Sequence, residues 1–326
     1  MSLATALTET VGIEHPVVLA PMGGVAGGAL AAGVSEGGGL GMIGGGRGDR
    51  SWLTRECDIA AAQTKKSWGI GFLSWAVSSQ TVEWAIEQNP AAIMLSFGDP
   101  TPFSDSIRNA GKVLIIQVTT MREAQQALDV GADIIVAQGS EAGGHGGGRA
   151  TLPFVPAVVD IAGSTPVLAA GGIADGRGLA AALMLGAAGA VIGTRFEATY
   201  EALLDAEESK AITAAEAADT VRGRILDIAA DAGWPAEYPA RTLRNGFIDT
   251  WQGRESELTS DQAALAEFRT AVERGDHDYL PIWAGEAVDL ITELDSARVL
   301  VARIATQAEH AITAGGNTVR AHGVRH

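Results

Sequence analysis

Eight short apolar runs follow one another in the first two hundred residues. Each run is followed by a polar or glycine-rich turn and then by an amphipathic or alanine-rich stretch. The runs span residues 16–20, 40–43, 68–73, 92–97, 113–118, 133–137, 166–170 and 190–192. Runs rich in Val, Ile and Leu are typical of strands, and the stretches between them suit helical crossovers rather than hairpins. Because eight such units can close on themselves, the sequence predicts an α/β fold, a (β/α)₈ TIM barrel over residues 1–200.

One of the crossover helices, expected over residues 120–130, carries signals at both ends. Thr120 offers a hydroxyl at the N-cap and Glu123 follows three residues later, which is the spacing of a capping box. Gly131 stands where a glycine commonly ends a helix. Further helices are expected over residues 51–65, 80–88 and 176–185.

The pattern changes after about residue 200, where Ala- and Glu-rich segments follow without strand-like runs. Residues 201–326 are therefore expected to form a C-terminal helical appendage that packs on the barrel. The spacing of several apolar side chains near the end indicates one helix face, made by Val288, Ile291, Leu294, Leu300, Val301 and Ile304. This face predicts core packing on the barrel, and a homodimer contact is the alternative.

Charge and composition exclude several classes of partner. The chain has 23 Lys and Arg against 39 Asp and Glu, so it lacks the cationic excess that binds nucleic acid or an anionic membrane surface. Cys57 is the only cysteine, which excludes an intramolecular disulfide and predicts a buried, inert thiol in a reducing compartment. Residues 1–9 do not resemble a leader, no window reaches the roughly 18 uncharged apolar residues of a membrane span, and a cytoplasmic location is expected. The histidines do not have metal-ligand spacing, so no metal is expected.

Gly39, Gly41 and Gly44 satisfy the G-x-G-x-x-G pattern of dinucleotide-binding folds. That fingerprint needs a strand before its first glycine and a helix from its third. Here a helix-like stretch precedes the pattern, and the pattern itself overlaps an expected strand. A Rossmann site is therefore not expected.

Glycines end the last two expected strands, where barrel enzymes often bind a phosphate group. Gly171 and Gly172 follow Ala170 at the end of the seventh strand, and Gly193 and Thr194 follow the eighth. Glycine amides can approach a phosphate closely, and a threonine hydroxyl can add a hydrogen bond. These residues predict a phosphate-bearing ligand; the alternative is that the glycines only permit tight turns.

His145 lies in the glycine-rich loop QGSEAGGHGGGR of residues 138–149, after the sixth strand. Active sites of such barrels form at the carboxyl ends of the strands, so the imidazole is expected at the mouth. Histidine titrates near neutral pH and can take a proton from carbon, while Gly143 and Gly144 let the backbone pass close to a flat ligand. The alternative is a surface histidine in a flexible loop.

Other residues at the same end of the barrel are candidates for a ring-binding pocket. Pro21, Met22 and Gly23 follow the first strand and can form a floor beneath a planar ring. Gln117 and Gln138 end the fifth and sixth strands, where their amides can reach the polar edge of a ring or simply cap the strands. Two tryptophans are candidate walls of a substrate pocket, with ordinary packing as their alternative: Trp75 and Trp283.

Taken together, these motifs resemble the nitronate monooxygenase family, formerly called 2-nitropropane dioxygenases, which are FMN-dependent barrel enzymes related to FMN-containing enoyl-ACP reductases. The resemblance covers about the first two hundred residues. It rests on VLAPMG at 18–23, AAGVSEGGGLG at 31–41, QGSEAGGH at 138–145, AAGGIADGR at 169–177 and GTRF at 193–196.

The resemblance implies a role for each candidate residue. Gly171, Gly172, Gly193 and Thr194 would hold the FMN phosphate, and His145 would occupy the position of the catalytic base. The flavin ring and ribityl chain would be surrounded by Met22, Gly23, Gln117, Gln138, Gly143 and Gly144. Two departures concern the substrate and oxidant: glycines follow His145 where the family often has Arg or Pro, and Gln117 stands where some members have Lys.

The implied reaction is oxidation of alkyl nitronates by O₂ to a carbonyl compound and nitrite, with nitroalkanes as further substrates. His145 would deprotonate a neutral nitroalkane, whereas for a nitronate it would orient the nitro oxygens. The alternatives are an NAD(P)H-dependent FMN reductase of quinones or enoyl thioesters, and a flavin-binding protein without turnover, because a fold alone does not determine the reaction.

Overall fold

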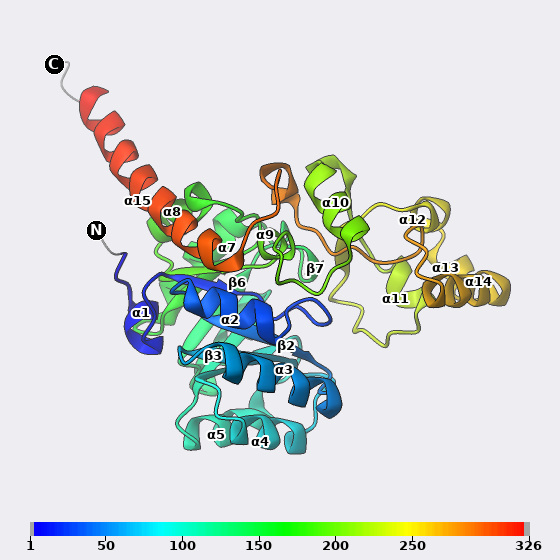
Figure 1. The fold of residues 1–326 in the computed structure, drawn as a ribbon, viewed down its shortest axis with the longest axis horizontal. Helices are drawn as coiled ribbons and strands as arrows, with labels where there is room; N and C mark the ends of the chain where they lie inside the picture. Colours follow the sequence, from blue (N-terminus) through cyan, green and yellow to red (C-terminus); the bar gives the residue numbers. More distant parts are fainter. Residues whose placement is uncertain (1–2, 323–326) are drawn as a thin grey trace.

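The computed structural model describes residues 3–322. Its centre is a parallel eight-stranded sheet (Figure 1). The strands pair in the order β1-β9-β8-β6-β5-β4-β3-β2. Leu19 N donates to Leu40 O, and Leu40 N donates to Val17 O, both at 2.9 Å, so the first strand also meets the start of the second and closes a barrel. The strands are β1 (Val17–Leu19), β2 (Gly41–Gly46), β3 (Trp68–Leu73), β4 (Ala92–Ser96), β5 (Val113–Val118), β6 (Ile134–Gln138), β8 (Val167–Ala170) and β9 (Gly189–Ile192). The predicted TIM barrel is confirmed, and each predicted run overlaps one strand.

Helices connect these strands and cover the outside of the barrel. Their bounds are α1 (Ala6–Val11), α2 (Gly28–Glu36), α3 (Arg50–Gln63), α4 (Ser79–Glu87), α5 (Thr101–Asn109), α6 (Met121–Asp129), α7 (Thr151–Ala162), α8 (Gly176–Met184) and α9 (Thr194–Glu197). The capping box predicted for α6 is present: Glu123 N donates to Thr120 Oγ1 at 3.2 Å, and Thr120 N donates to the Glu123 carboxylate at 3.1 Å.

Alternation along the strands divides the core into two parts. On β5, Leu114 and Ile116 pack with the surrounding helices, whereas Ile115 packs with Met94 and Val136 inside the barrel. Successive strand residues point to opposite faces, so a strand buried on both faces must be apolar throughout. Burying each such side chain contributes about 1.5–3 kcal/mol. Cys57 lies on α3 within the outer part, and burial raises the pKa of its thiol to about 12.

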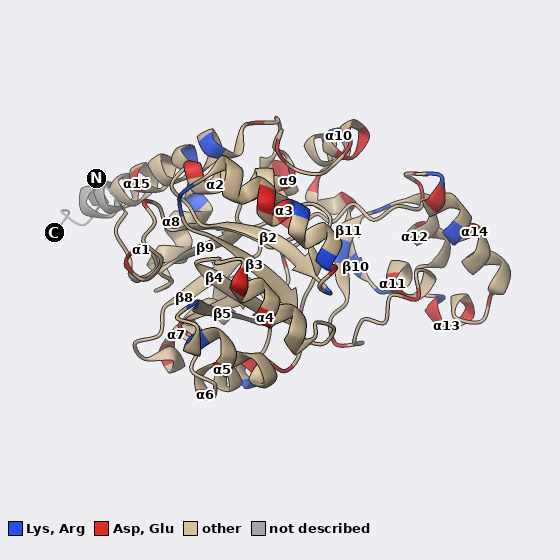
Figure 2. Cartoon of the chain, turned by 60° about the horizontal axis from the view of Figure 1, so that its bottom comes forward, with Lys and Arg blue, Asp and Glu red and all other residues tan. Residues whose placement is uncertain are grey.

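The C-terminal region is more varied than the sequence predicts. Its elements are α10 (Ala206–Ala214), η1 (Ala217–Asp219), β10 (Thr220–Gly223), α11 (Ile225–Ala229), β11 (Ala240–Leu243), α12 (Gly246–Trp251), α13 (Glu255–Leu258), α14 (Gln262–Glu273), η2 (Glu286–Leu290) and α15 (Ala297–His322). The strands β10 and β11 form a second sheet with β7 (Gly144–His145). The sequence does not predict β10 and β11, because an Arg interrupts the apolar residues of each strand. They lie between the barrel and helices α11 to α14 and carry basic side chains (Figure 2).

The last helix returns to the barrel. Leu300, Val301 and Ile304 on α15 pack in the same cluster as residues of α2 and α8, as expected (Figure 1). Val288 and Ile291 lie before α15 in another cluster, with Leu294 exposed, so the predicted apolar residues do not share one helix face. The domain boundary near residue 200 stays a prediction. Within residues 3–322, every helix is too short or too polar to cross a membrane.

Candidate functional site

A cavity of about 320 Å³ opens at the carboxyl ends of the barrel strands. All the candidate residues but one line it, although they come from six segments spread over the chain. These are Pro21, Met22, Gly23, Gln117, Gln138, Gly143, Gly144, His145, Ala170, Gly171, Gly172, Gly193, Thr194 and Trp283. The exception is Trp75. The size falls within the range of small-molecule sites, and the cavity is therefore the candidate active site.

Two glycines after β8 shape one wall of the cavity. Gly171 and Gly172 have φ of +99° and +73°, in the left-handed region that other residues rarely adopt. A Cβ on Gly171 would also lie 2.9 Å from Gly139 O. After β9, Thr194 Oγ1 accepts a hydrogen bond of 3.0 Å from Gly285 N, which leaves the hydroxyl proton free to donate elsewhere. The glycines therefore permit tight turns and also expose backbone to the cavity.

Gln138 brings an unsatisfied acceptor to the site. Its Nε2 donates to His145 O at 3.0 Å, which ties the end of β6 to the loop that carries the histidine. Its Oε1 is buried and has no hydrogen-bond partner within the described part of the chain. A buried acceptor without a partner costs roughly 1–3 kcal/mol, so this oxygen is suited to a ligand that donates a hydrogen bond.

The side chain of His145 is largely shielded from solvent and is held on two sides. Its Nε2 lies 3.0 and 3.1 Å from the two carboxylate oxygens of Asp227, and the two side chains are only 9% and 7% exposed. The indole of Trp234 stacks on the imidazole, with centroids 3.4 Å apart and an interplanar angle of 8°. Trp283 lies at 5.3 Å, tilted by 47°. His145 is therefore not a mobile surface side chain, which was the alternative.

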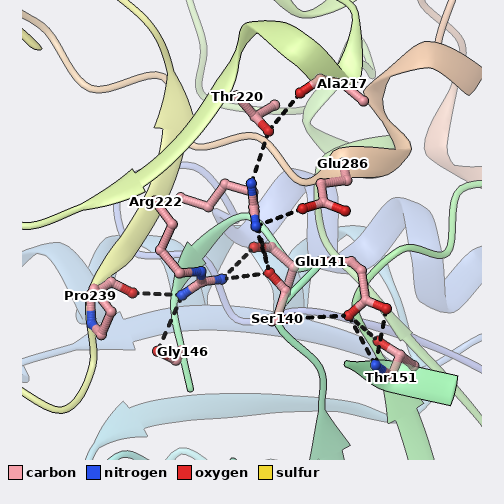
Figure 3. Close-up of polar contacts among 11 residues, drawn as sticks. Ser140, Glu141, Gly146, Thr151, Ala217, Thr220, Arg222, Pro239 and Glu286 are labelled. Carbon is pink, nitrogen blue, oxygen red and sulfur yellow. Dashed lines mark hydrogen bonds and ion pairs between the residues drawn. The ribbon is translucent and has the colours of Figure 1, made fainter. Parts of the chain in front are cut away.

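Two arginines of the C-terminal strands fasten the backbone of the histidine loop (Figure 3). Arg222 on β10 donates to the carbonyls of Ser140 and Ala142, both at 3.0 Å, and to that of Gly146 at 3.1 Å. Arg241 on β11 also donates to Ser140 O and forms an ion pair with Glu286. Burial, followed by repulsion from Arg241, lowers the pKa of Arg222 to about 10, so it remains charged at neutral pH.

Trp75 occupies a different position from the one expected. It lies 5.3 Å from Trp234, on which Phe97 also packs at 5.3 Å, and the guanidinium of Arg47 lies 4.5 Å from the Trp75 ring. Trp234 lines the cavity, whereas Trp75 contacts Trp234 without lining the cavity itself. The sequence does not show which of these two tryptophans lines the cavity, because the loop that brings Trp234 to the barrel contains no recognisable motif.

Glu197 is a further cavity residue that sequence reasoning missed. It ends α9, one helical turn after Thr194, and is 3% exposed. Burial, with a smaller contribution from Glu208, raises the pKa of its carboxyl to about 8. The cavity thus contains a carboxylic acid that is mostly neutral at pH 7. Among the described residues, no group of His, Cys, Asp and Glu side chains is arranged to hold a metal ion.

The chain is similar to known proteins along most of its length. It matches the family model described as nitronate monooxygenase over residues 4–74 and 51–307. A (3aS,4S,5R,7aS)-5-hydroxy-7a-methyl-1-oxo-octahydro-1H-indene-4-carboxyl-CoA dehydrogenase from Rhodococcus jostii (strain RHA1) is 36% identical over 231 residues, which cover 69% of this chain and 64% of that relative.

Two further proteins match almost the whole chain. A nitronate monooxygenase from Neurospora crassa is 31% identical over 346 residues, covering 92% of this chain and 90% of the relative. The solved structure of FabK from Thermotoga maritima superposes with a TM-score of 0.85 at 30% identity, covering 97% of this chain and 99% of that chain. The chain is an oxidoreductase and belongs to the nitronate monooxygenase family.

Proposed function

We propose that the cavity binds FMN. The fit is supported by the unpartnered Gln138 Oε1, which a hydrogen-bond donor of the ligand would satisfy, and by two glycines of the lining, Gly23 and Gly144, at which a Cβ would meet no protein atom within 4 Å. Gly171, Gly172, Gly193 and Thr194, beside Ala170, would hold the phosphate. The ring and ribityl chain would contact Pro21, Met22, Gly23, Gln117, Gln138, Gly143 and Gly144.

We further propose that the enzyme oxidises alkyl nitronates with O₂ to a carbonyl compound and nitrite. Bound FMN supplies the electron transfer, and the chain supplies position and electrostatics. The observation that carries this proposal is the imidazole of His145, only 9% exposed, on the wall of the glycine-lined cavity. With a nitroalkane as substrate, His145 takes the proton from the carbon that bears the nitro group. With a nitronate, that proton is already absent, and the imidazole orients the anion. Trp234 and Trp283 flank the imidazole and would exclude water from the substrate.

A second candidate is an NAD(P)H-dependent FMN enzyme that acts on a thioester. Its substrate class, a thioester, is favoured by the Rhodococcus relative, a carboxyl-CoA dehydrogenase that is 36% identical to this chain over 231 residues. The same cavity would hold FMN in either case.

Oxygen uptake and nitrite release by the purified, flavin-loaded protein separate the two candidates. With ethyl nitronate and with nitroethane, we expect nitrite to accumulate as oxygen is consumed. NADPH with an enoyl thioester should give no turnover. Thioester turnover without nitrite from either nitro compound would reject the nitronate reaction in favour of the second candidate.

A further inference from the structure

We propose that Asp227 is a positioning residue for the catalytic base: it holds the His145 imidazole in the tautomer that carries the proton on Nε2. Nδ1 is then the nitrogen that takes the substrate proton. This inference rests on the proposed function, since it concerns the same proton transfer, but it assigns a role to a residue of the C-terminal region.

The contact itself determines the tautomer. Both carboxylate oxygens of Asp227 lie within 3.1 Å of His145 Nε2. An ionised carboxylate can only accept hydrogen bonds, so Nε2 must be the donor. In the neutral imidazole the proton then resides on Nε2, and Nδ1 presents a lone pair. When Nδ1 has taken a proton, the imidazolium is stabilised by the adjacent carboxylate, whose hydrogen bond becomes charge-assisted.

Among residues 3–322, no other contact of the imidazole distinguishes between its two nitrogens. Trp234 stacks parallel to the ring at 3.4 Å, which prevents the ring from tilting but is indifferent to which nitrogen carries the proton. Trp283 contacts the ring at an angle of 47° and is likewise neutral in this respect. Gln138 is bonded to the backbone oxygen of His145 rather than to its ring. The choice of protonated nitrogen therefore depends on Asp227.

The fold brings Asp227 to this position through one short segment. Strand β10 contributes Arg222, which binds three carbonyls of the histidine loop, and α11 follows with Asp227 five residues later. Strand β11 pairs Ala240 with His145. The same segment thus fixes the backbone of the loop and the orientation of the imidazole, so the C-terminal region is part of the catalytic unit rather than only a cover.

Two substrates distinguish positioning from a structural role. Asp227→Asn removes the charge at nearly constant volume, and it should lower kcat/KM for nitroethane about 100-fold, in the range of a lost proton-transfer catalyst. Ethyl nitronate needs no proton removal, so its oxidation should change by less than about threefold. Asp249→Asn is the matched control: this carboxylate lies on α12, is 58% exposed and pairs with Arg244, and its loss should change neither rate. Equal losses on both substrates, or none on nitroethane, would overturn the proposal.

A spectroscopic measurement tests the tautomer without using turnover. In ¹⁵N-histidine-labelled holoprotein the chain gives six histidines, and the His145 signals are identified by their absence in His145→Asn. We expect the neutral wild-type ring to carry its proton on Nε2 alone, and Asp227→Ala, which leaves no acceptor at this position, to admit a measurable Nδ1-protonated population as in free histidine. A ring that stays entirely Nε2-protonated in Asp227→Ala would refute the role of Asp227. If the wild type releases no nitrite, the proposed reaction fails, and this spectrum still decides the role of Asp227.

Discussion

The indole of Trp234 lies parallel to the imidazole of His145, with ring centroids 3.4 Å apart and an interplanar angle of 8°. His145 belongs to the barrel half of the chain, whereas Trp234 belongs to the loop between α11 and β11. The stack, backed by Trp75 and Phe97, therefore joins the two parts of the chain at the candidate base.

Removing this stack should weaken catalysis without abolishing it. A stacked aromatic pair contributes about 0.5–1.5 kcal/mol beyond area burial, so Trp234→Ala should lower kcat/KM for nitroethane by roughly two- to tenfold. Trp234→Phe retains a ring and should lose less. Steady-state nitrite release measures both, and an Ala variant as active as the wild type would show that the stack does not position the base.

Replacing the base should separate the two kinds of substrate. His145→Asn cannot accept a proton at this position, so nitroethane oxidation should fall by about 10²- to 10⁴-fold, while ethyl nitronate oxidation is largely retained. The two rates are compared at saturating substrate on flavin-loaded protein. Equal loss on both substrates would mean that His145 serves binding or folding instead of proton removal.

The barrel and most of the cavity wall could be predicted because their signals are local. An apolar run such as residues 113–118 predicts a buried strand, and the capping pair Thr120 and Glu123 predicts the start of the helix that follows it. Residues that follow parallel strands then converge at one end of the barrel, which places His145 and Gly172 in one cavity with no knowledge of their contacts.

Asp227 and Trp234 could not be predicted, because their positions depend on pairing over long distances in the sequence. Asp227 lies 82 residues after His145, and the contact requires β11 to pair with the two-residue strand β7. Neither strand has a clear apolar pattern: β10 reads TVRG and β11 reads ARTL. The place of Trp75 could not be predicted for the same reason, since only the fold shows that Trp234 lines the cavity and that Trp75 contacts Trp234.

Strain in the glycine wall should weaken flavin binding. Gly172 has φ +73°, and Gly172→Ala adds about 1–2 kcal/mol of strain in the left-handed conformation. Without FMN the loop can move and relieve this strain, but it must return to the left-handed conformation to bind FMN, so the strain opposes binding. We expect the Kd for FMN, measured by fluorescence quenching, to rise roughly 5- to 30-fold.

Gly111→Ala provides the control for this substitution. Gly111 has a similar φ of +69°, its Cβ would meet no atom within 4 Å, and it lies outside the cavity lining. This variant should lose similar stability and keep the FMN affinity of the wild type. Equal loss of affinity in the two variants would show that Gly172 has no specific part in binding.

The buried carboxyl of Glu197 should make stability depend on pH. Its pKa is raised from 4.5 to about 8, so between these values the unfolded carboxyl is ionised while the folded one keeps its proton. The wild type should therefore lose stability as pH rises through this window, by at most about 1.4 kcal/mol per pH unit, and no further above pH 8. Glu197→Gln removes this slope.

Urea unfolding of holoprotein at about pH 5.5 and 7.5 measures the effect. The stability of Glu197→Gln relative to wild type should increase by on the order of 2 kcal/mol between the two values. All other titrating groups are shared by the two proteins and cancel in the comparison. A constant difference would mean that Glu197 is ionised in the folded protein at neutral pH.

The most direct test of the proposed reaction is the visible spectrum of the flavin-loaded protein under anaerobic conditions. Without oxygen, the substrate that delivers electrons must leave the flavin reduced and its yellow colour bleached. We predict bleaching by ethyl nitronate, return of the colour when oxygen is admitted, and no bleaching by NADH or NADPH. Bleaching by NADH or NADPH with none by the nitronate would contradict the proposed function.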